Sequence, residues 1–441
     1  MSSGLGRASA LLASGTIVSR ILGFARTLLL TIVLSGQSTV IGNALTISNQ
    51  MPTSLYALIG GGLVSAVLVP QTIRASRGAD GGVAYINKLV TIAIVAIGSL
   101  TIALTIAAPL VIGVTASNPT TYAVAVPFAY WAMPQIVFLG MYSVLGEVLN
   151  ARKKFGAYTW APVANNVVAL ATLGLFLVLF SAVPKDATTP LPPLQSFVLA
   201  GGTTLGLAVQ ALTLALVWRR SGLRFRFDFH WRGVGLKATG QAAGWTFAML
   251  VLTQAAGFLQ VRIADDASSL GTASNFALSN AWLLFMLPHS IITVSLATAF
   301  YPRMSEHAAE GDTAAVRDDL STSLRTVLFA IGLAAAVLLA AALSVSAIFS
   351  HSSEEASATA PVLIAYVLGL LPFTALYLVQ RAFYALGDTR TPFRFTIAQL
   401  IVVVPGIGHE GMRMSAVAAA YWFDGVMPQA PSMTRRIKME L

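Results

Sequence analysis

The sequence predicts an all-α membrane protein that crosses the bilayer many times. Of its 441 residues, 56% are hydrophobic and only 10% are charged, whereas about a quarter of the residues of a soluble domain are charged. The charges are also missing from long stretches, because no Asp, Glu, Lys or Arg occurs at positions 27–73, 89–146 or 267–302. A membrane-spanning helix needs about 20 largely apolar residues. Each of these stretches therefore holds one or two spans.

The apolar stretches and the loops between them predict about 11 spans. These are 11–36, 40–73, 85–114, 121–150, 157–183, 194–218, 236–264, 272–301, 324–350, 357–386 and 393–407. Alternate loops are basic, as at Arg152, Lys153 and Lys154, whereas the loops between them contain Lys185 as their only cation. The positive-inside rule therefore places the amino terminus and the basic loops in the cytoplasm. It also accounts for the net charge of +10 without nucleic acid as a partner.

Two pairs of similar segments indicate an internal repeat. Residues 50–70 and 285–302 each contain Pro and Ser near the start and Pro at the end, and residues 148–155 resemble 382–393. Pro52 and Pro288 lie 236 positions apart, and Ala151 and Ala385 lie 234 apart. We therefore expect two lobes built on a six-helix unit, at 1–220 and, incomplete, at 236–404, that form parallel repeats around a central cavity, an arrangement common in transporters.

Two arginines lie within the first predicted span, in the stretch S-R-I-L-G-F-A-R at 19–26. Arg20 and Arg26 are each about 4–5 Å from the middle of this span. The membrane interface is about 15 Å from the middle, which is further than an arginine side chain comfortably reaches. An unpaired arginine at this depth costs at least about 2.5–3.5 kcal/mol. The pair therefore needs either buried partners or a water-filled site.

Two interpretations of these arginines stay open. In the first, they pair with backbone carbonyls, with Glu147, which is the only acidic residue of the first six spans, or with Asp265 or Asp266 of the second half. In the second, Arg20 and Arg26 line a cationic cavity. Six residues separate their directions by about 120°, which suits a wide anion such as pyrophosphate, and the planar guanidinium matches phosphate oxygens.

Arg262, in the seventh predicted span, is a third candidate for binding an anion. Its position near the outer end of that span, close to Asp265 and Asp266, equally favours an ordinary ion pair. Glu354 and Glu355 form a small acidic loop that we expect to be solvated.

Several kinds of chemistry are not expected from this sequence. The absence of cysteine excludes disulfides, iron–sulfur clusters and thiol chemistry. There is no G-x-x-x-x-G-K-[ST] loop for ATP hydrolysis, and the five histidines are scattered without metal-ligand spacing. We therefore expect a transporter rather than an enzyme, with no cofactor and no metal.

Three motifs resemble those of a known family. They are S-R-I-L-G-F-A-R at 19–26, L-P-H-S-I-I-T-V-S-L-A-T-A-F-Y-P-R-M-S at 287–305 and R-A-F-Y-A-L-G-D-T-R-T-P at 381–392. Over about residues 7–404 the chain resembles the MurJ/MviN lipid II flippases of the MOP exporter superfamily. The resemblance implies fourteen helices in two lobes around a cationic cavity, and alternating access driven by an ion gradient or the membrane potential. It also implies that Arg20 and Arg26 bind the substrate, an undecaprenyl-pyrophosphate-linked peptidoglycan precursor.

The chain departs from this family pattern in places. Asn43 stands where many members have an acidic residue, Tyr56 stands where they have a basic one, and N-A-W-L-L-F-M-L-P at 280–288 lacks their Arg and Glu. Asn43 and Tyr56 are nevertheless candidate substrate contacts by position. The apolar run from Phe395 stops at Pro405, so we expect a truncated or frame-shifted carboxyl end and a poorly ordered tail at 405–441.

These observations predict a lipid II flippase in the bacterial cytoplasmic membrane. Its expected partners are the lipid-linked anionic substrate and membrane lipids, with the cell-wall synthesis machinery as a further candidate. Two alternatives remain, namely another MOP exporter for a different polyprenyl-linked glycan or a drug, and a non-transporting scaffold or inactive remnant of the cell-wall machinery.

Overall fold

The computed structural model describes residues 2–57, 83–151, 155–220, 225–230, 236–268 and 274–407. Within these ranges the chain forms helices and no strand, so the prediction of an all-α protein is confirmed. The second halves of the 40–73 span and of the 50–70 repeat segment, as well as nearly all of the predicted tail at 405–441, lie outside the described residues.

The chain divides into two compact units. Unit 1 comprises Met1–Ser35 and Thr39–Val251, and unit 2 comprises Gly36–Ser38 and Leu252–Leu441. The division therefore falls inside one long helix, α11 (Leu236–Ser268), whereas the sequence suggested a boundary between 220 and 236.

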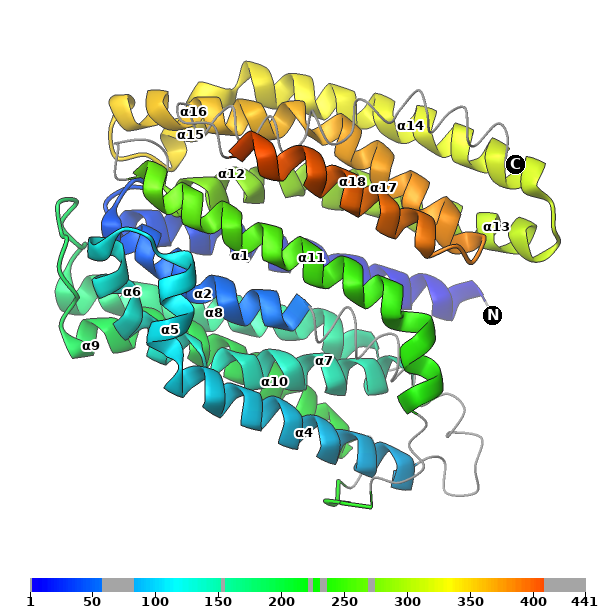
Figure 1. Cartoon of the computed structure of the whole chain (residues 1–441), viewed down its shortest axis with the longest axis horizontal. Helices are drawn as coiled ribbons and strands as arrows, with labels where there is room; N and C mark the ends of the chain where they lie inside the picture. Colours follow the sequence, from blue (N-terminus) through cyan, green and yellow to red (C-terminus); the bar gives the residue numbers. More distant parts are fainter. Residues whose placement is uncertain are drawn as a thin grey trace. The chain divides into compact units, whose positions relative to one another are not determined.

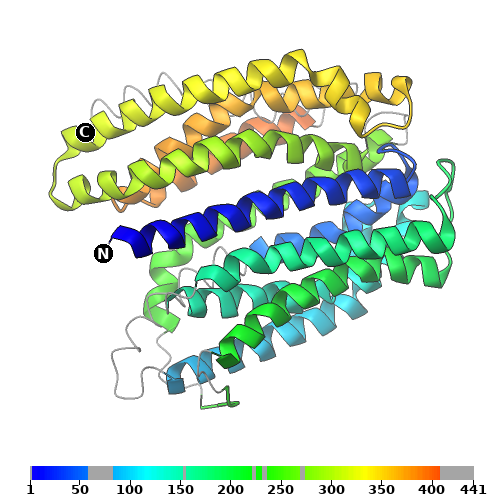
Figure 2. The same ribbon diagram turned by 180° about the vertical axis from the view of Figure 1, so that it is seen from behind.

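Unit 1 is built from long helices that lie side by side (Figures 1 and 2). Helix α1 packs along α8, α8 packs along α10, and α2 packs against α6. The elements of unit 1 before α11 are α1 (Ser2–Val33), α2 (Val40–Tyr56), α4 (Val83–Ile106), α5 (Ala108–Thr115), α6 (Pro119–Ala132), α7 (Gln135–Ala151), α8 (Phe155–Phe180), α9 (Pro193–Ser196), η2 (Phe197–Gly201) and α10 (Gly202–Arg220).

Unit 2 has the same style of packing, with α13 against α14, α14 against α17 and α12 against α16. Its elements after α11 are α12 (Asn275–Pro288), η3 (His289–Thr293), α13 (Val294–Ala309), α14 (Thr313–Ala340), α15 (Ala342–Ile348), α16 (Ser353–Leu368), α17 (Leu370–Ala385) and α18 (Arg390–Ile407).

The helix starts recur at a nearly constant offset, which supports the predicted internal repeat. Five pairs of starts lie 234 or 235 positions apart: Val40 and Asn275, Ala108 and Ala342, Pro119 and Ser353, Gln135 and Leu370, and Phe155 and Arg390. The breaks recur as well, because Ala107 between α4 and α5 corresponds to Ala341 between α14 and α15. An offset of about 235 agrees with the values of 234 and 236 found in the sequence.

Prolines explain two of the irregular places. Helices α6 and α7 meet at a bend of 42°, next to Pro134, which has no N–H to continue the helical ladder. In unit 2, Pro288 ends α12, and the five-residue π-helix η3 follows directly. Local π-helical turns relieve a missing i→i−4 bond and are frequent at functional sites.

Seven helices in the described residues are long and apolar enough to cross a membrane, or eight when the bent pair α6–α7 is counted as one span. They include residues 14–33 of α1 and the whole of α4. This confirms a multi-pass membrane protein. The total of about 11 spans and the central cavity stay predictions.

A polar network holds the short piece of unit 2 formed by Gly36–Ser38. The carboxylate of Glu355, at the start of α16, accepts hydrogen bonds from the backbone N–H groups of Gln37 (2.8 Å), Ser38 (2.7 Å) and His351 (2.8 Å). The side chain of Gln37 donates to Ser350 and Thr359 and accepts from Asn280.

The expectation that Glu355 is solvated was wrong, because it is 5% exposed. The sequence held a signal for its position. Ser352 caps α16 by accepting from the N–H of Glu355, which is the S-x-x-E pattern of a capping box. Gly36 adopts φ +125°, and a Cβ there would lie 2.7 Å from a Glu355 carboxylate oxygen, so the tight approach requires glycine.

Candidate functional site

The first helix carries the two predicted site arginines and is held against α8 by a stripe of small residues. Asn166 of α8 donates a hydrogen bond to the backbone oxygen of Ser19 (3.0 Å). A Cβ at Gly15 would lie 2.8 Å from Thr159 Cγ2, and a Cβ at Gly23 would lie 3.8 Å from Asn166 Nδ2. Small residues at a spacing of four thus let α1 and α8 approach closely, as is common between membrane helices.

Arg20 and Arg26 point in different directions from the axis of this helix. At 100° per residue, Arg26 lies about 20° from the direction of Ser19, whereas Arg20 lies about 100° from it. By this geometry Arg26 lies nearer than Arg20 to the side of α1 that carries Ser19. Both are partly buried. Among the described residues, neither guanidinium has a hydrogen bond, an ion pair or a stacked ring.

The candidates on α2 lie far apart along their helix. Asn43 is buried near its amino-terminal end, and Tyr56 is its last residue. Thirteen residues separate them, a rise of about 20 Å. A small anionic group cannot contact both at once, so at most one of these two belongs to a compact phosphate site.

Tyr56 belongs to a cluster of tyrosines that the sequence did not predict. Its hydroxyl interacts electrostatically with Tyr158, whose ring stacks on that of Tyr142 with centroids 5.0 Å apart. The hydroxyl of Tyr142 donates to the backbone oxygen of Tyr158 (3.1 Å). A Cβ at Gly146 would clash with the Tyr158 ring, so a glycine on α7 makes room for this ring. These three residues come from α2, α7 and α8, and no short sequence motif links them.

A second polar contact joins α2 to α7 at membrane depth. Gln135 donates to the side-chain oxygen of Asn49 (2.8 Å), and Asn49 donates to the backbone oxygen of Leu45. Polar groups buried in a membrane protein are satisfied by such internal bonds. Asn49 was visible in the sequence as a polar residue inside a span, but its partner was not.

Arg262 is exposed on α11, and Asp265, less than one turn further on, is fully buried. The side chain of Asp266 is also exposed. Arg262 belongs to unit 2, whereas the other site candidates belong to unit 1. Its role stays a prediction, either as an anion-binding residue or as a member of an ion pair.

Metal binding was also considered. In the part of the chain that the structure describes, no three or more His, Asp or Glu side chains are grouped so that they could hold a metal ion.

The fold defines a class of protein. Solved structures with similar folds include an inward-facing multidrug MATE transporter of the MOP superfamily, with a TM-score of 0.74 and 12% identity over 98% of both chains. Another is the inward-closed conformation of the lipid II flippase MurJ, with a TM-score of 0.76 and 19% identity over 96% of this chain and 87% of that one. The chain therefore has the fold of the MOP transporters.

The family follows from the sequence comparisons. The family model described as lipid II flippase MurJ matches residues 36–420, so the chain belongs to the MurJ lipid II flippase family. Similar relatives include the probable lipid II flippase MurJ of Rickettsia prowazekii, 21% identical over 98% of this chain and 85% of the relative. The lipid II flippase MurJ of Burkholderia cenocepacia is 26% identical over 91% and 78%. Arg20 and Arg26 precede the residues matched by the family model.

Proposed function

We propose that this chain moves lipid II across the bacterial cytoplasmic membrane, with its amino terminus in the cytoplasm. Membership of the lipid II flippase family supports the substrate class. The observation that carries a role for this chain's own residues is the pair Arg20 and Arg26, which lie in a membrane-spanning helix without a protein partner among the described residues.

The two arginines suit the pyrophosphate of a lipid-linked precursor. They are about 9 Å apart along the helix axis and about 120° apart around it, so each binds a different part of a wide anion. A guanidinium fork forms paired hydrogen bonds with phosphate oxygens, which are stronger than neutral ones. The partly buried position strengthens the attraction, because water screens it less than at the surface.

Transport then proceeds by alternating access without a change of covalent bonds. The arginines capture the pyrophosphate from the cytoplasmic side, the protein changes from inward-open to outward-open, and the anion leaves on the other side. An inside-negative membrane potential favours outward movement of negative charge by about 2.3 kcal/mol per charge per 100 mV. We infer partners among the enzymes that make and consume lipid II.

The test is complementation of a bacterium depleted of its own lipid II flippase, followed by a flipping assay with the purified chain in vesicles. We expect the chain to restore growth and to translocate lipid II. Translocation of other polyprenyl-linked glycans with no activity on lipid II would instead indicate a different MOP exporter. Normal insertion with no translocation of any lipid-linked substrate would indicate a scaffold.

A further inference from the structure

The loop between α10 and α11 contains an unusual described segment, F-R-F-D-F-H at 225–230. It has no regular secondary structure, and its aromatic and polar residues alternate. In an extended chain, alternate side chains point to the same side. The rings of Phe225 and Phe227 accordingly meet with centroids 4.9 Å apart, and those of Phe227 and Phe229 are parallel at 6.1 Å. We call residues 225–230 the aromatic strap.

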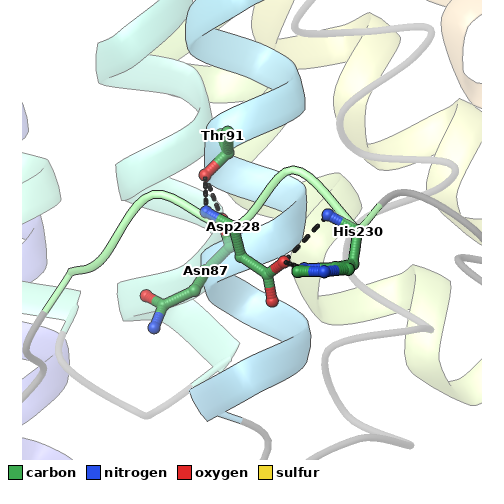
Figure 3. Close-up of polar contacts among 4 residues, drawn as sticks. All are labelled: Asn87, Thr91, Asp228 and His230. Carbon is green, nitrogen blue, oxygen red and sulfur yellow. Dashed lines mark hydrogen bonds and ion pairs between the residues drawn. The ribbon is translucent and has the colours of Figure 1, made fainter.

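The aromatic strap is fastened to the first turns of α4, as Figure 3 shows. The backbone N–H of Asp228 donates to the hydroxyl of Thr91 (3.0 Å). The backbone N–H of Arg226 donates to the side-chain oxygen of Asn87 (3.4 Å). The hydroxyl of Thr91 in turn donates to the backbone oxygen of Asn87 (2.7 Å). Two side chains one helical turn apart therefore hold two alternate amides of the aromatic strap.

The phenylalanine rings are not buried by this attachment. Phe227 is 61% exposed and Phe229 is 62% exposed, although the segment is held in place by hydrogen bonds. Adjacent exposed aromatic rings on an ordered segment mark a surface that meets another apolar phase.

The position along α4 identifies that phase as the membrane. Helix α4 is one of the helices long and apolar enough to span it. Asn87 and Thr91 lie about 6 and 12 Å along the helix from Val83. A helix of 24 residues is about 36 Å long, against a hydrocarbon core of about 30 Å. A core centred on this helix begins about 3 Å from Val83, so Asn87 lies just inside the boundary between headgroups and acyl chains and Thr91 lies deeper, among the acyl chains. The aromatic strap that they hold therefore lies within the membrane surface rather than out in water.

Beside the rings, the described arginines outnumber the one carboxylate of the aromatic strap, Asp228. Arg226 alternates with the phenylalanines and is exposed, and Arg219 and Arg220 are exposed at the end of α10. Basic residues beside a span attract anionic lipids, and apolar rings next to them insert at the headgroup level. The positive-inside pattern places this loop on the cytoplasmic side.

We propose that the aromatic strap and its arginines form a binding site for anionic phospholipids of the cytoplasmic leaflet. The rings of Phe227 and Phe229 insert among the acyl chains just below the headgroups, and Arg226 and the end of α10 bind lipid phosphates. This site is separate from the arginines of α1, and it does not depend on which substrate the chain transports.

The absence of cysteine makes single-cysteine labelling a direct test. A fluorophore is attached at F229C, and separately at F227C, in the full chain reconstituted in bilayers that contain acyl-brominated phosphatidylglycerol or phosphatidylcholine. Cysteine at Val178, which is 83% exposed on α8, serves as the lipid control, and cysteine at Thr188, exposed in a loop, serves as the water control.

We expect quenching at both strap positions to approach that at Val178, and to be stronger with brominated phosphatidylglycerol than with brominated phosphatidylcholine. R226Q should weaken the preference for phosphatidylglycerol by up to about fivefold, whereas K185Q, the removal of an exposed cation elsewhere, should leave it unchanged. T91V should reduce quenching at 229, and T105V, in the same helix, should not.

Quenching at both strap positions as low as at Thr188 would overturn the proposal. Quenching without any preference for phosphatidylglycerol, or a preference that R226Q does not alter, would also overturn it, because the rings would then meet lipid without an anion-binding site.

Discussion

Helices α1 and α11 hold the same place in the two repeats, since their last residues, Val33 and Ser268, are 235 positions apart. At this offset, the counterparts of Arg20 and Arg26 are Ala255 and Val261. One repeat thus has two cations where the other has two small or branched apolar residues. The helix forms in both cases, so the fold itself does not require the arginines.

Other charges in the described residues have partners inside the protein. Glu355 accepts from three backbone amides. Arg381 donates to the hydroxyl of Tyr377 (2.9 Å) and lies over the rings of Tyr377 and Tyr301. A charge that has hydrogen-bond or ring partners inside the protein stabilises the fold. A charge within a membrane span that has no such partner is costly, and its retention indicates a functional role. The contrast separates structural from functional charge.

The largest effect is therefore expected at Arg20 and Arg26. Replacing either with Ala should lower lipid II translocation by at least about a hundredfold, since a charge-assisted bond to phosphate is worth about 1.5–3 kcal/mol and each arginine forms two. Thermal stability in detergent should change little, because no internal bond is lost. Translocation in vesicles and melting by size-exclusion chromatography measure the two quantities. Lys at either position should retain part of the activity, as it keeps the charge without the fork.

Arg381 provides the matched control. R381M should lower thermal stability, because it leaves the Tyr377 hydroxyl without its partner, yet it should retain translocation. If R20A and R26A lowered the melting temperature and left translocation normal, the arginines of α1 would be structural. The difference between α1 and α11 would then not indicate a substrate-binding role.

The next effect concerns Glu355 and is one of stability. E355A leaves the amides of Gln37, Ser38 and His351 without their acceptor. Each buried unsatisfied donor costs about 1–3 kcal/mol, and with partial rescue by water we expect a total loss of about 2–4 kcal/mol. Thermal unfolding of the purified chain measures it. The neighbouring Glu354 is exposed, so E354A should stay close to the wild type. Equal melting of the two variants would show that the network does not hold residues 36–38.

A smaller effect is expected at the ion pair between α13 and α14. Asp319 has an 8% exposed side chain and lies 2.9 Å from Arg303 and 3.0 Å from His307. R303A leaves this buried carboxylate with His307 alone, and because Arg303 is itself 61% exposed, the loss should be only about 1 kcal/mol.

The adjacent pair Arg317 and Asp318 is exposed on both sides and 3.9 Å apart, so R317A should have no measurable effect. Chemical unfolding compares the two variants. A loss in R317A as large as in R303A would mean that burial of the carboxylate does not matter here.

Much of the fold could be predicted from the sequence because each membrane-spanning helix corresponds to a long apolar stretch. The all-α class and the repeat offset of about 235 follow from such local patterns. The breaks inside spans were less visible. The bend at Pro134 and the break at Ala107 have a local cause, since Pro109 is the second residue of α5, whereas the break at Ala341 is followed by the apolar segment A-L-S-V-S-A-I, which contains no proline.

Candidate site residues could be proposed from the sequence only where a single residue is informative by itself. Arg20 and Arg26 are costly at their depth, and this cost can be read from one helix. The cluster of Tyr56, Tyr142 and Tyr158 could not be found in the same way, because its members come from three helices. Glu355 was misjudged for a related reason, since its three amide donors include two from residues more than 300 positions away.

The smallest effect is expected at Asp228 in the aromatic strap. Its ion pair with His230 is exposed to water, whereas the arginines of α1 are partly buried. The backbone N–H of His230 donates to its carboxylate (2.9 Å). This bond, together with the His230 ring and Lys88, holds the pKa of Asp228 below its ordinary value. A lowered pKa means that the contribution to stability is complete above the ordinary pKa of about 3.9 and is lost as the pH falls through the lowered value.

The fluorescence of a label at F229C should therefore be constant from neutral pH down to about 5 and change only in more acidic buffer. D228N should abolish that acid transition, and a wild-type transition between pH 6 and 8 would show that a different group controls the aromatic strap.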